Sequence, residues 1–195
     1  MLRLTKITII LTILTFALTS FTSEQDASAA DFPASVDNFL KKYSADFSVV
    51  SETYLGNNGN DFILDKTETT WYKSVTLKNK KSFKSKYNQT VYQRLFLGFY
   101  QYDTEEQCSA ALDSLLNCFG TDCGKIKWGD DVKAIKTTPI VYLINEKTII
   151  FCKIHCEHTD NFWTTFKHDL IMTFGNGASG IIEAGCGGPI NFRKF

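Results

Sequence analysis

The sequence has few of the residues that enzymes use most often for acid–base chemistry or metal binding. Only three histidines occur among its 195 residues, His155, His158 and His168. It contains no Gly-x-Ser-x-Gly elbow, no His-Glu-x-x-His motif and no glycine-rich phosphate-binding loop. No motif therefore indicates an enzyme, and we expect no catalytic residue, no bound metal and no cofactor.

The sequence also lacks an excess of charge of either sign. It has 21 basic and 21 acidic residues, so no overall field attracts it to nucleic acid. After the first thirty residues, no apolar run approaches the ~20 residues that a membrane-spanning helix needs. We therefore expect neither nucleic acid as a partner nor an integral membrane segment in the mature chain.

Residues 1–29 have the layout of a secretory signal peptide. Arg3 and Lys6 precede an apolar run from Ile7 to Phe21, and small residues end the segment at Ala29. The apolar run is shorter than the ~20 residues of a transmembrane anchor, which is the alternative interpretation. We expect cleavage after Ala29 and a secreted or periplasmic protein.

Cysteine is absent before residue 108. The six cysteines are Cys108, Cys118, Cys123, Cys152, Cys156 and Cys186. An even number of cysteines in an exported chain indicates disulfides, because oxidising compartments do not keep thiols reduced. This asymmetry predicts an N-terminal extension over 30–90 that packs on a disulfide-stapled α+β domain over 91–195.

Periodicity assigns the secondary structure along the chain. In the extension, it predicts a helix over 35–43 and a strand over 47–55. In the domain it predicts four strands, over 91–102, 139–145, 148–157 and from 180 to a Gly-Pro turn. It predicts two helices, over 103–116 and 161–174, so the order is strand, helix, strand, strand, helix, strand. This βαββαβ order predicts a ferredoxin-like antiparallel sheet, and right-handed crossovers would place both helices on one face.

Residues 97–112, LGFYQYDTEEQCSAAL, resemble the opening strand and helix of SPOR peptidoglycan-binding domains, which have the same βαββαβ order. The resemblance is limited to this segment. The six cysteines and the long N-terminal half depart from the SPOR pattern, so the resemblance serves as an analogy and does not assign the chain to that family.

Residues 149–158, IIFCKIHCEH, combine two cysteines with two histidines. The β-branched composition predicts a strand, in which Cys152 and Cys156 are about 13 Å apart. That distance excludes a mutual disulfide, which needs Cα atoms within ~7 Å, and a shared metal. On this strand Cys152 and Cys156 face one way and His155 faces the other.

The expected topology predicts the disulfide pairing. The third and fourth strands of the domain run parallel in a ferredoxin-like sheet, so their ends, with Cys156 and Cys186, lie at one edge. The helix that ends at Cys118 brings Cys123 to the same edge, while Cys108 faces the sheet near Cys152. The expected pairs are Cys118–Cys123, Cys156–Cys186 and Cys108–Cys152, and the alternative is a zinc site formed by the edge cysteines with His158.

The leading hypothesis is an exported, disulfide-stabilised, non-enzymatic domain that binds an unknown cell-envelope or extracellular partner. The contact would use the lysine-rich loop over 78–89 or an aromatic sheet face. The candidate ligand-binding residues are His155, His158, Lys80, Lys81, Lys84 and Tyr100. The alternative is a metal-binding or thiol-dependent enzyme that uses the edge cluster, with Cys156 as nucleophile beside His158, His168 and Asp169.

Overall fold

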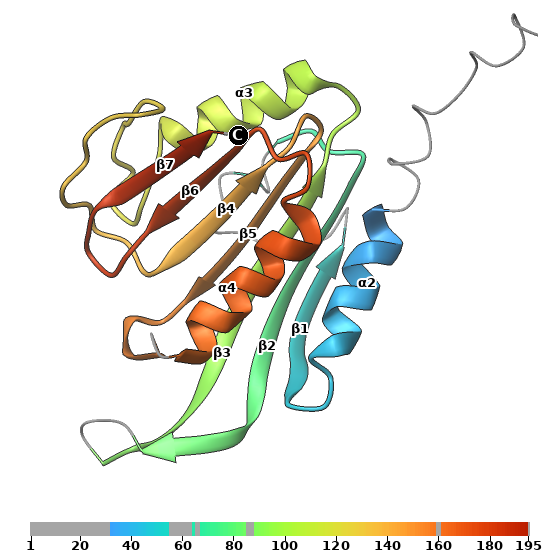
Figure 1. Cartoon of the computed structure of the whole chain (residues 1–195), viewed down its shortest axis with the longest axis vertical. Coiled ribbons are helices and arrows are strands. Elements are labelled where there is room, and N and C mark those ends of the chain that lie inside the picture. Colours follow the sequence, from blue (N-terminus) through green and yellow to red (C-terminus); the bar gives the residue numbers. More distant parts are fainter. Residues whose placement is uncertain (1–31, 55–63, 65–66, 85–87, 159–160, 195) are drawn as a thin grey trace, which may run out of the picture. The chain divides into compact units, whose positions relative to one another are not determined.

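The computed structural model describes residues 32–54, 64, 67–84, 88–158 and 161–194 (Figure 1). The expected signal peptide, residues 1–29, lies outside the described residues. The chain divides into two compact units, Met1–Asp37 and Asn38–Phe195. In the first unit the structure describes only the start of one helix, residues 32–37. None of the helices in the described part of the chain is long and apolar enough to cross a membrane.

The second unit is a mixed α and β structure built on one antiparallel sheet. Its helices are α2 (Phe32–Lys42), which begins in the first unit, α3 (Glu105–Leu116) and α4 (Asn161–Phe174). Its strands are β1 (Phe47–Tyr54), β2 (Trp71–Lys84), β3 (Thr90–Gln101), β4 (Ile140–Ile144), β5 (Thr148–Ile154), β6 (Gly180–Ala184) and β7 (Ile190–Lys194). A short 3₁₀ turn, Cys156–His158, follows β5.

The sheet order is β1-β2-β3-β5-β4-β6-β7, and every neighbouring pair is antiparallel. The ferredoxin-like prediction is therefore wrong. In that fold the strand after α4 would pair with β3, but β2 occupies this edge of β3 along most of its length, from Trp71 opposite Gln101 to Lys84 opposite Thr90. β6 instead pairs with β4, and β7 adds a strand that the sequence pattern did not indicate.

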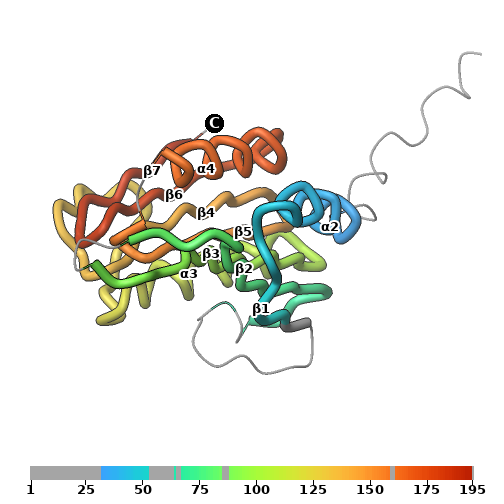
Figure 2. Tube along the Cα trace, turned by 90° about the horizontal axis from the view of Figure 1, so that it is seen from below, coloured from blue at the N-terminus to red at the C-terminus, as the bar shows by residue number. Residues whose placement is uncertain are grey.

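This strand order also separates the helices. β3 and β4 run parallel with β5 between them, and β5 and β6 run parallel with β4 between them. The connection from β3 through α3 to β4 and the connection from β5 through α4 to β6 both move across the sheet toward β7. However, β3 and β4 point in the direction opposite to β5 and β6. Right-handed crossovers therefore place α3 and α4 on opposite faces, as Figure 2 shows, and the prediction that both helices share a face is wrong.

The face under α3 carries an aromatic core. Tyr100 is fully buried and stacks on Tyr72, with ring centroids 5.8 Å apart, and on Phe151 at 6.1 Å. Thr104 begins α3 with a capping box, in which its hydroxyl accepts from the Gln107 amide while the Gln107 side chain accepts from the Thr104 amide. The predicted helix start is thus confirmed.

The face under α4 carries a second apolar layer, which includes Phe166, Leu170 and the inner residues of β3 and β5. Phe39, in the part of α2 that belongs to this unit, contacts Phe166 at 5.6 Å between ring centroids. Nearby, the Tyr43 hydroxyl donates to the Asp169 carboxylate and Lys42 forms an ion pair of 2.6 Å with the same group. These contacts join the segment before β1 to α4.

Candidate functional site

The face that α3 covers continues beyond this helix onto an exposed part of the sheet. β3 pairs with β5 only from Leu95 to Gln101, while its first residues pair with β2 alone, so the two strands extend past β5 (Figure 1). Along this face the β3 side chains change from fully buried Tyr100 to half-buried Phe96 and then to exposed Arg94 and Tyr92. We call this region the cationic face, and it consists of Lys78, Tyr92, Arg94, Phe96, Lys153 and His155.

Aromatic rings hold the cations of this face in place. The Lys78 ammonium lies 4.1 Å from the centre of the Tyr92 ring, and the Lys153 ammonium lies 5.5 Å from that of Phe96. The His155 ring meets the Phe96 ring edge-on at 5.4 Å. Cation–π attraction restricts the lysine side chains, so their charges are positioned before any ligand arrives.

Lys78 and Arg94 are directly opposite each other on neighbouring strands. Like charges in this arrangement repel and destabilise a sheet. Among the described residues, no carboxylate lies within ion-pair distance of either side chain. The structure therefore holds two adjacent positive charges that nothing in the described chain neutralises, which favours an external anion.

An open groove of ≈ 600 Å³ lies beside these cations, at the end of β5. Its lining includes Tyr92, Arg94, Thr138, His155, Glu157 and His158. The volume falls within the ~300–1,000 Å³ of ordinary small-molecule sites. The groove combines cations, one carboxylate and hydroxyl groups, which suits a polar ligand better than an apolar one.

The sequence named both histidines of the groove, and the structure brings them together with their ring centroids 5.7 Å apart. His158 is buried against Phe83, and its backbone carbonyl accepts a hydrogen bond of 3.4 Å from the Gln93 side chain. His155 is exposed at the end of β5. His158 therefore supports the groove from within, while His155 is available to a ligand.

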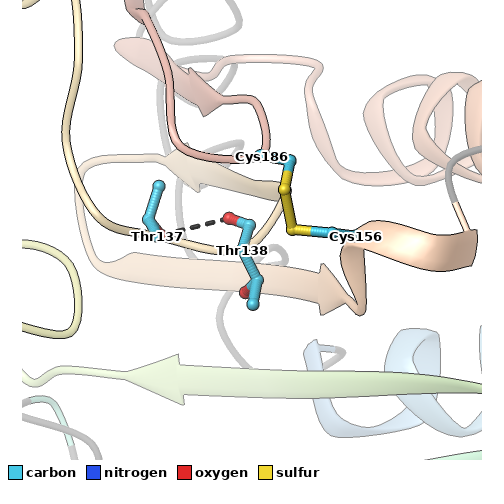
Figure 3. The surroundings of a disulfide bond; sticks show 4 residues. All are labelled: Thr137, Thr138, Cys156 and Cys186. Atoms are coloured by element: carbon cyan, nitrogen blue, oxygen red, sulfur yellow. Dashed lines mark hydrogen bonds between the residues drawn. A yellow bond between two sulfur atoms is a disulfide. The ribbon is translucent and has the colours of Figure 1, made fainter.

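A disulfide holds the turn that forms this side of the groove. Cys156 is bonded to Cys186, with Cα atoms 5.4 Å apart, and Thr137 and Thr138 lie beside the bond (Figure 3). The backbone N–H of Gly187 donates to the Thr137 carbonyl at 3.0 Å, which ties the same loop to the segment before β4. The 156–158 turn is thus joined covalently to the loop after β6.

Two of the three expected disulfides are present. Cys118–Cys123 and Cys156–Cys186 are formed, the second because β5 and β6 run parallel and end at the same edge. The expected Cys108–Cys152 bond is wrong. Cys108 belongs to α3 and is buried between this helix and the sheet, whereas Cys152 faces the opposite side of the sheet, so the sheet itself separates the two thiols.

Both remaining thiols are buried. Burial, together with the nearby Glu105 carboxylate, raises the pKa of the Cys108 thiol to about 12. Burial raises the pKa of the Cys152 thiol well above its ordinary value. Because the thiolate is the reactive form, neither cysteine has the environment of a nucleophile.

Among the residues that the structure describes, the zinc ligands and the thiol active site that the sequence left open are not assembled. The edge cysteines are sulfurs of two disulfides and offer no thiolate to a metal or a substrate. In the described ranges, no three histidine, cysteine or acidic side chains converge as metal ligands. Asp169, part of the thiol hypothesis, is instead bound to Lys42 and Tyr43.

The other residues that the sequence named as ligand-binding candidates lie outside the cationic face and the lining of the groove. Residues 78–84 belong to strand β2 and not to a loop, because pairing with β3 continues past the irregular register between Lys78 and Ser82. Lys80 donates to the backbone carbonyl of Ser44 at 2.7 Å, Lys84 donates to the Thr90 hydroxyl at 2.9 Å, and Lys81 is exposed. Tyr100 is a core residue with no exposed surface.

Sequence reasoning missed two cations of this face, Arg94 and Lys153, and named Lys78 only as the first residue of the 78–89 segment. A signal was present, because Tyr92, Arg94 and Phe96 alternate along one strand and therefore share a face. Lys153 also alternates with His155. Only the strand register reveals that Lys78 lies opposite Arg94 and that Lys153 lies opposite Phe96.

No family model, no curated protein and no solved structure matches this chain. The resemblance of residues 97–112 to SPOR domains is not supported either. The elements from β3 to β6 follow one another in the order βαββαβ, but β6 pairs with β4 and the ferredoxin-like sheet is not formed.

Proposed function

We propose that this protein is an exported, disulfide-stabilised, non-enzymatic domain that binds a cell-envelope or extracellular partner, and that the cationic face makes the contact. The observation that supports this most directly is the Lys78–Arg94 pair, in which two positive charges lie opposite each other without a carboxylate in ion-pair distance among the described residues. A bound anion between them would convert a repulsion into two favourable contacts.

The arrangement of the site supports binding without large rearrangement. Lys78 and Lys153 already lie over aromatic rings, so less side-chain entropy is lost when an anion binds. The groove beside them is bounded by a turn that a disulfide holds. These features favour a preformed recognition surface.

Export is supported by the signal-peptide pattern of residues 1–29 and by the two disulfides, which persist in oxidising compartments. In cultures of the source organism, we expect the protein in the extracytoplasmic fraction, with an N-terminus at Ala30. Mass spectrometry of fractionated cultures tests this. Recovery of the unprocessed chain from the cytoplasm would contradict export.

Binding is tested by adsorption of the purified protein to an envelope preparation from the same organism. We expect the double charge reversal Lys78→Glu with Arg94→Glu to remove adsorption, because an anionic partner would then meet two carboxylates. The matched control is Lys133→Glu, at an exposed lysine distant in sequence from this face. Equal adsorption of the wild type and the double variant would refute the assignment of the cationic face.

A further inference from the structure

We infer that the ligand of the cationic face is an acidic saccharide, in which sugar units carry an anionic group beside free hydroxyl groups. The inference rests on the proposed function and specifies its ligand class. Three features of the site support this ligand class: the gap between Lys78 and Arg94, the carboxylate of Glu157, and the size of the groove.

The gap between Lys78 and Arg94 suits one anionic group. Side chains directly opposite on antiparallel strands have Cβ atoms about 4.5–5.5 Å apart, so one carboxylate or sulfate reaches both cations. The Arg94 guanidinium offers two parallel donors to the oxygens of such a group. The Lys78 ammonium over Tyr92 offers a third contact from the other strand.

The Glu157 carboxylate determines which chemical groups of the ligand can lie next to its anionic group. It lines the groove together with Arg94 and His155, and among the described residues it has no ion-pair partner. A carboxylate only accepts hydrogen bonds and repels a second negative charge. The part of the ligand next to Glu157 should therefore carry hydrogen-bond donors and no negative charge, as sugar hydroxyls do, and the Thr90 and Thr138 hydroxyls add further partners.

A ligand for this site needs an anionic group next to a part without negative charge, and this requirement distinguishes an acidic saccharide from other polyanions. Polynucleotides and acidic polypeptides carry a charge at every repeat, so one of their charges would meet Glu157. Nucleic-acid-binding domains are also generally basic, whereas this chain has zero net charge and a pI of ≈ 6.8. The groove volume of ≈ 600 Å³ accommodates a short saccharide.

The test is calorimetric titration of the purified full chain with defined probes. These are a short oligosaccharide in which glucuronate alternates with an uncharged sugar, a sulfated oligosaccharide, the methyl-esterified form of the glucuronate oligosaccharide, oligothymidylate and oligoglutamate. We expect one or both acidic saccharides to bind, and the esterified, nucleotide and peptide probes to bind at least about tenfold more weakly, the loss typical of a missing charged hydrogen bond.

Two variants probe the two parts of the site separately. Arg94→Gln should raise the Kd of the acidic saccharide about tenfold, whereas the control Lys133→Gln should leave it unchanged. Glu157→Ala should weaken saccharide binding but strengthen oligothymidylate binding, because it removes both a hydroxyl acceptor and a repulsive charge. These opposite changes distinguish saccharide recognition from simple charge attraction, and unchanged circular dichroism confirms that each variant is folded.

The inference and the proposed function fail in different ways. Equal affinity for oligothymidylate or oligoglutamate, or stronger saccharide binding by Glu157→Ala, would show an unselective polyanion surface and overturn the inference. Absence of binding to both acidic saccharides would also overturn it, even if envelope adsorption still required Lys78 and Arg94. Envelope adsorption that is insensitive to the charge reversal would instead overturn the proposed function.

Discussion

The disulfide between Cys156 and Cys186 joins the carboxyl ends of two parallel strands, β5 and β6, across the end of the intervening strand β4. The same bond anchors the 156–158 turn, which carries Glu157 and His158 into the groove. One covalent bond therefore stabilises the fold and positions one wall of the candidate site.

Removal of this disulfide should cost more stability than removal of the other. The bond closes a loop with a sequence separation of 30, against 5 for Cys118–Cys123. On the chain-entropy model, Cys156→Ser with Cys186→Ser loses about 3 to 4 kcal/mol, and Cys118→Ser with Cys123→Ser about 2 kcal/mol. Urea denaturation measures both losses, and a larger loss for the shorter loop would contradict the entropic account.

Thiol counting should give two reactive cysteines and only in the denatured protein. Burial raises the pKa of Cys108 to about 12 and that of Cys152 well above its ordinary value, so at pH 8 almost no thiolate is present in the native state. We expect iodoacetamide to modify neither cysteine in the native protein and both in denaturant without reductant, as judged by mass spectrometry. No modification in denaturant would indicate a third disulfide.

Asp169 should contribute to stability at neutral pH and lose that contribution in acid. Burial opposes its ionisation, but hydrogen bonds from Lys42 and Tyr43 outweigh this effect and lower the pKa of the carboxyl below its ordinary value. A lowered folded-state pKa means that the contribution is complete above the unfolded-state pKa of ~4 and disappears as the pH falls through the folded-state pKa.

Asp169→Asn should therefore destabilise the protein at pH 7 and reduce the pH dependence of its stability below pH ~4. Tyr43→Phe, which removes a hydrogen bond to a charged group, should cost about 1.5 to 3 kcal/mol at pH 7. Denaturation followed by circular dichroism across this pH range measures both. Asp113→Asn, at an exposed position on α3, is the control and should have no comparable effect.

Thr104→Ala should destabilise the protein by about 1 kcal/mol, because it removes the side-chain acceptor at the start of α3. Ser109→Ala, at an exposed position within the same helix, is the matched control and should be neutral or slightly stabilising. Thermal unfolding compares the two variants. A greater loss for Ser109→Ala would argue against the capping box.

Local patterns in the sequence determined much of the secondary structure, because the forces involved act over a few residues. The apolar period of residues 161–174 matches α4, the Thr104 cap begins α3, and Asn145–Lys147 joins β4 to β5. Cys156 and Cys186 were placed at one edge through a ferredoxin-like sheet that does not form, and the placement still holds because β5 and β6 are parallel in the observed sheet, with β4 between them.

The strand order was decided only by tertiary structure, because it depends on which segment occupies each sheet edge. Residues 78–84 are rich in lysine and resemble a loop in isolation, yet they continue β2, which pairs along β3 and excludes β6 from that edge. β6 then pairs with β4, α4 is placed opposite α3, and Cys108 is separated from Cys152. The same pairing sets Lys78 opposite Arg94, so the candidate site follows from a long-range register that no local pattern contains.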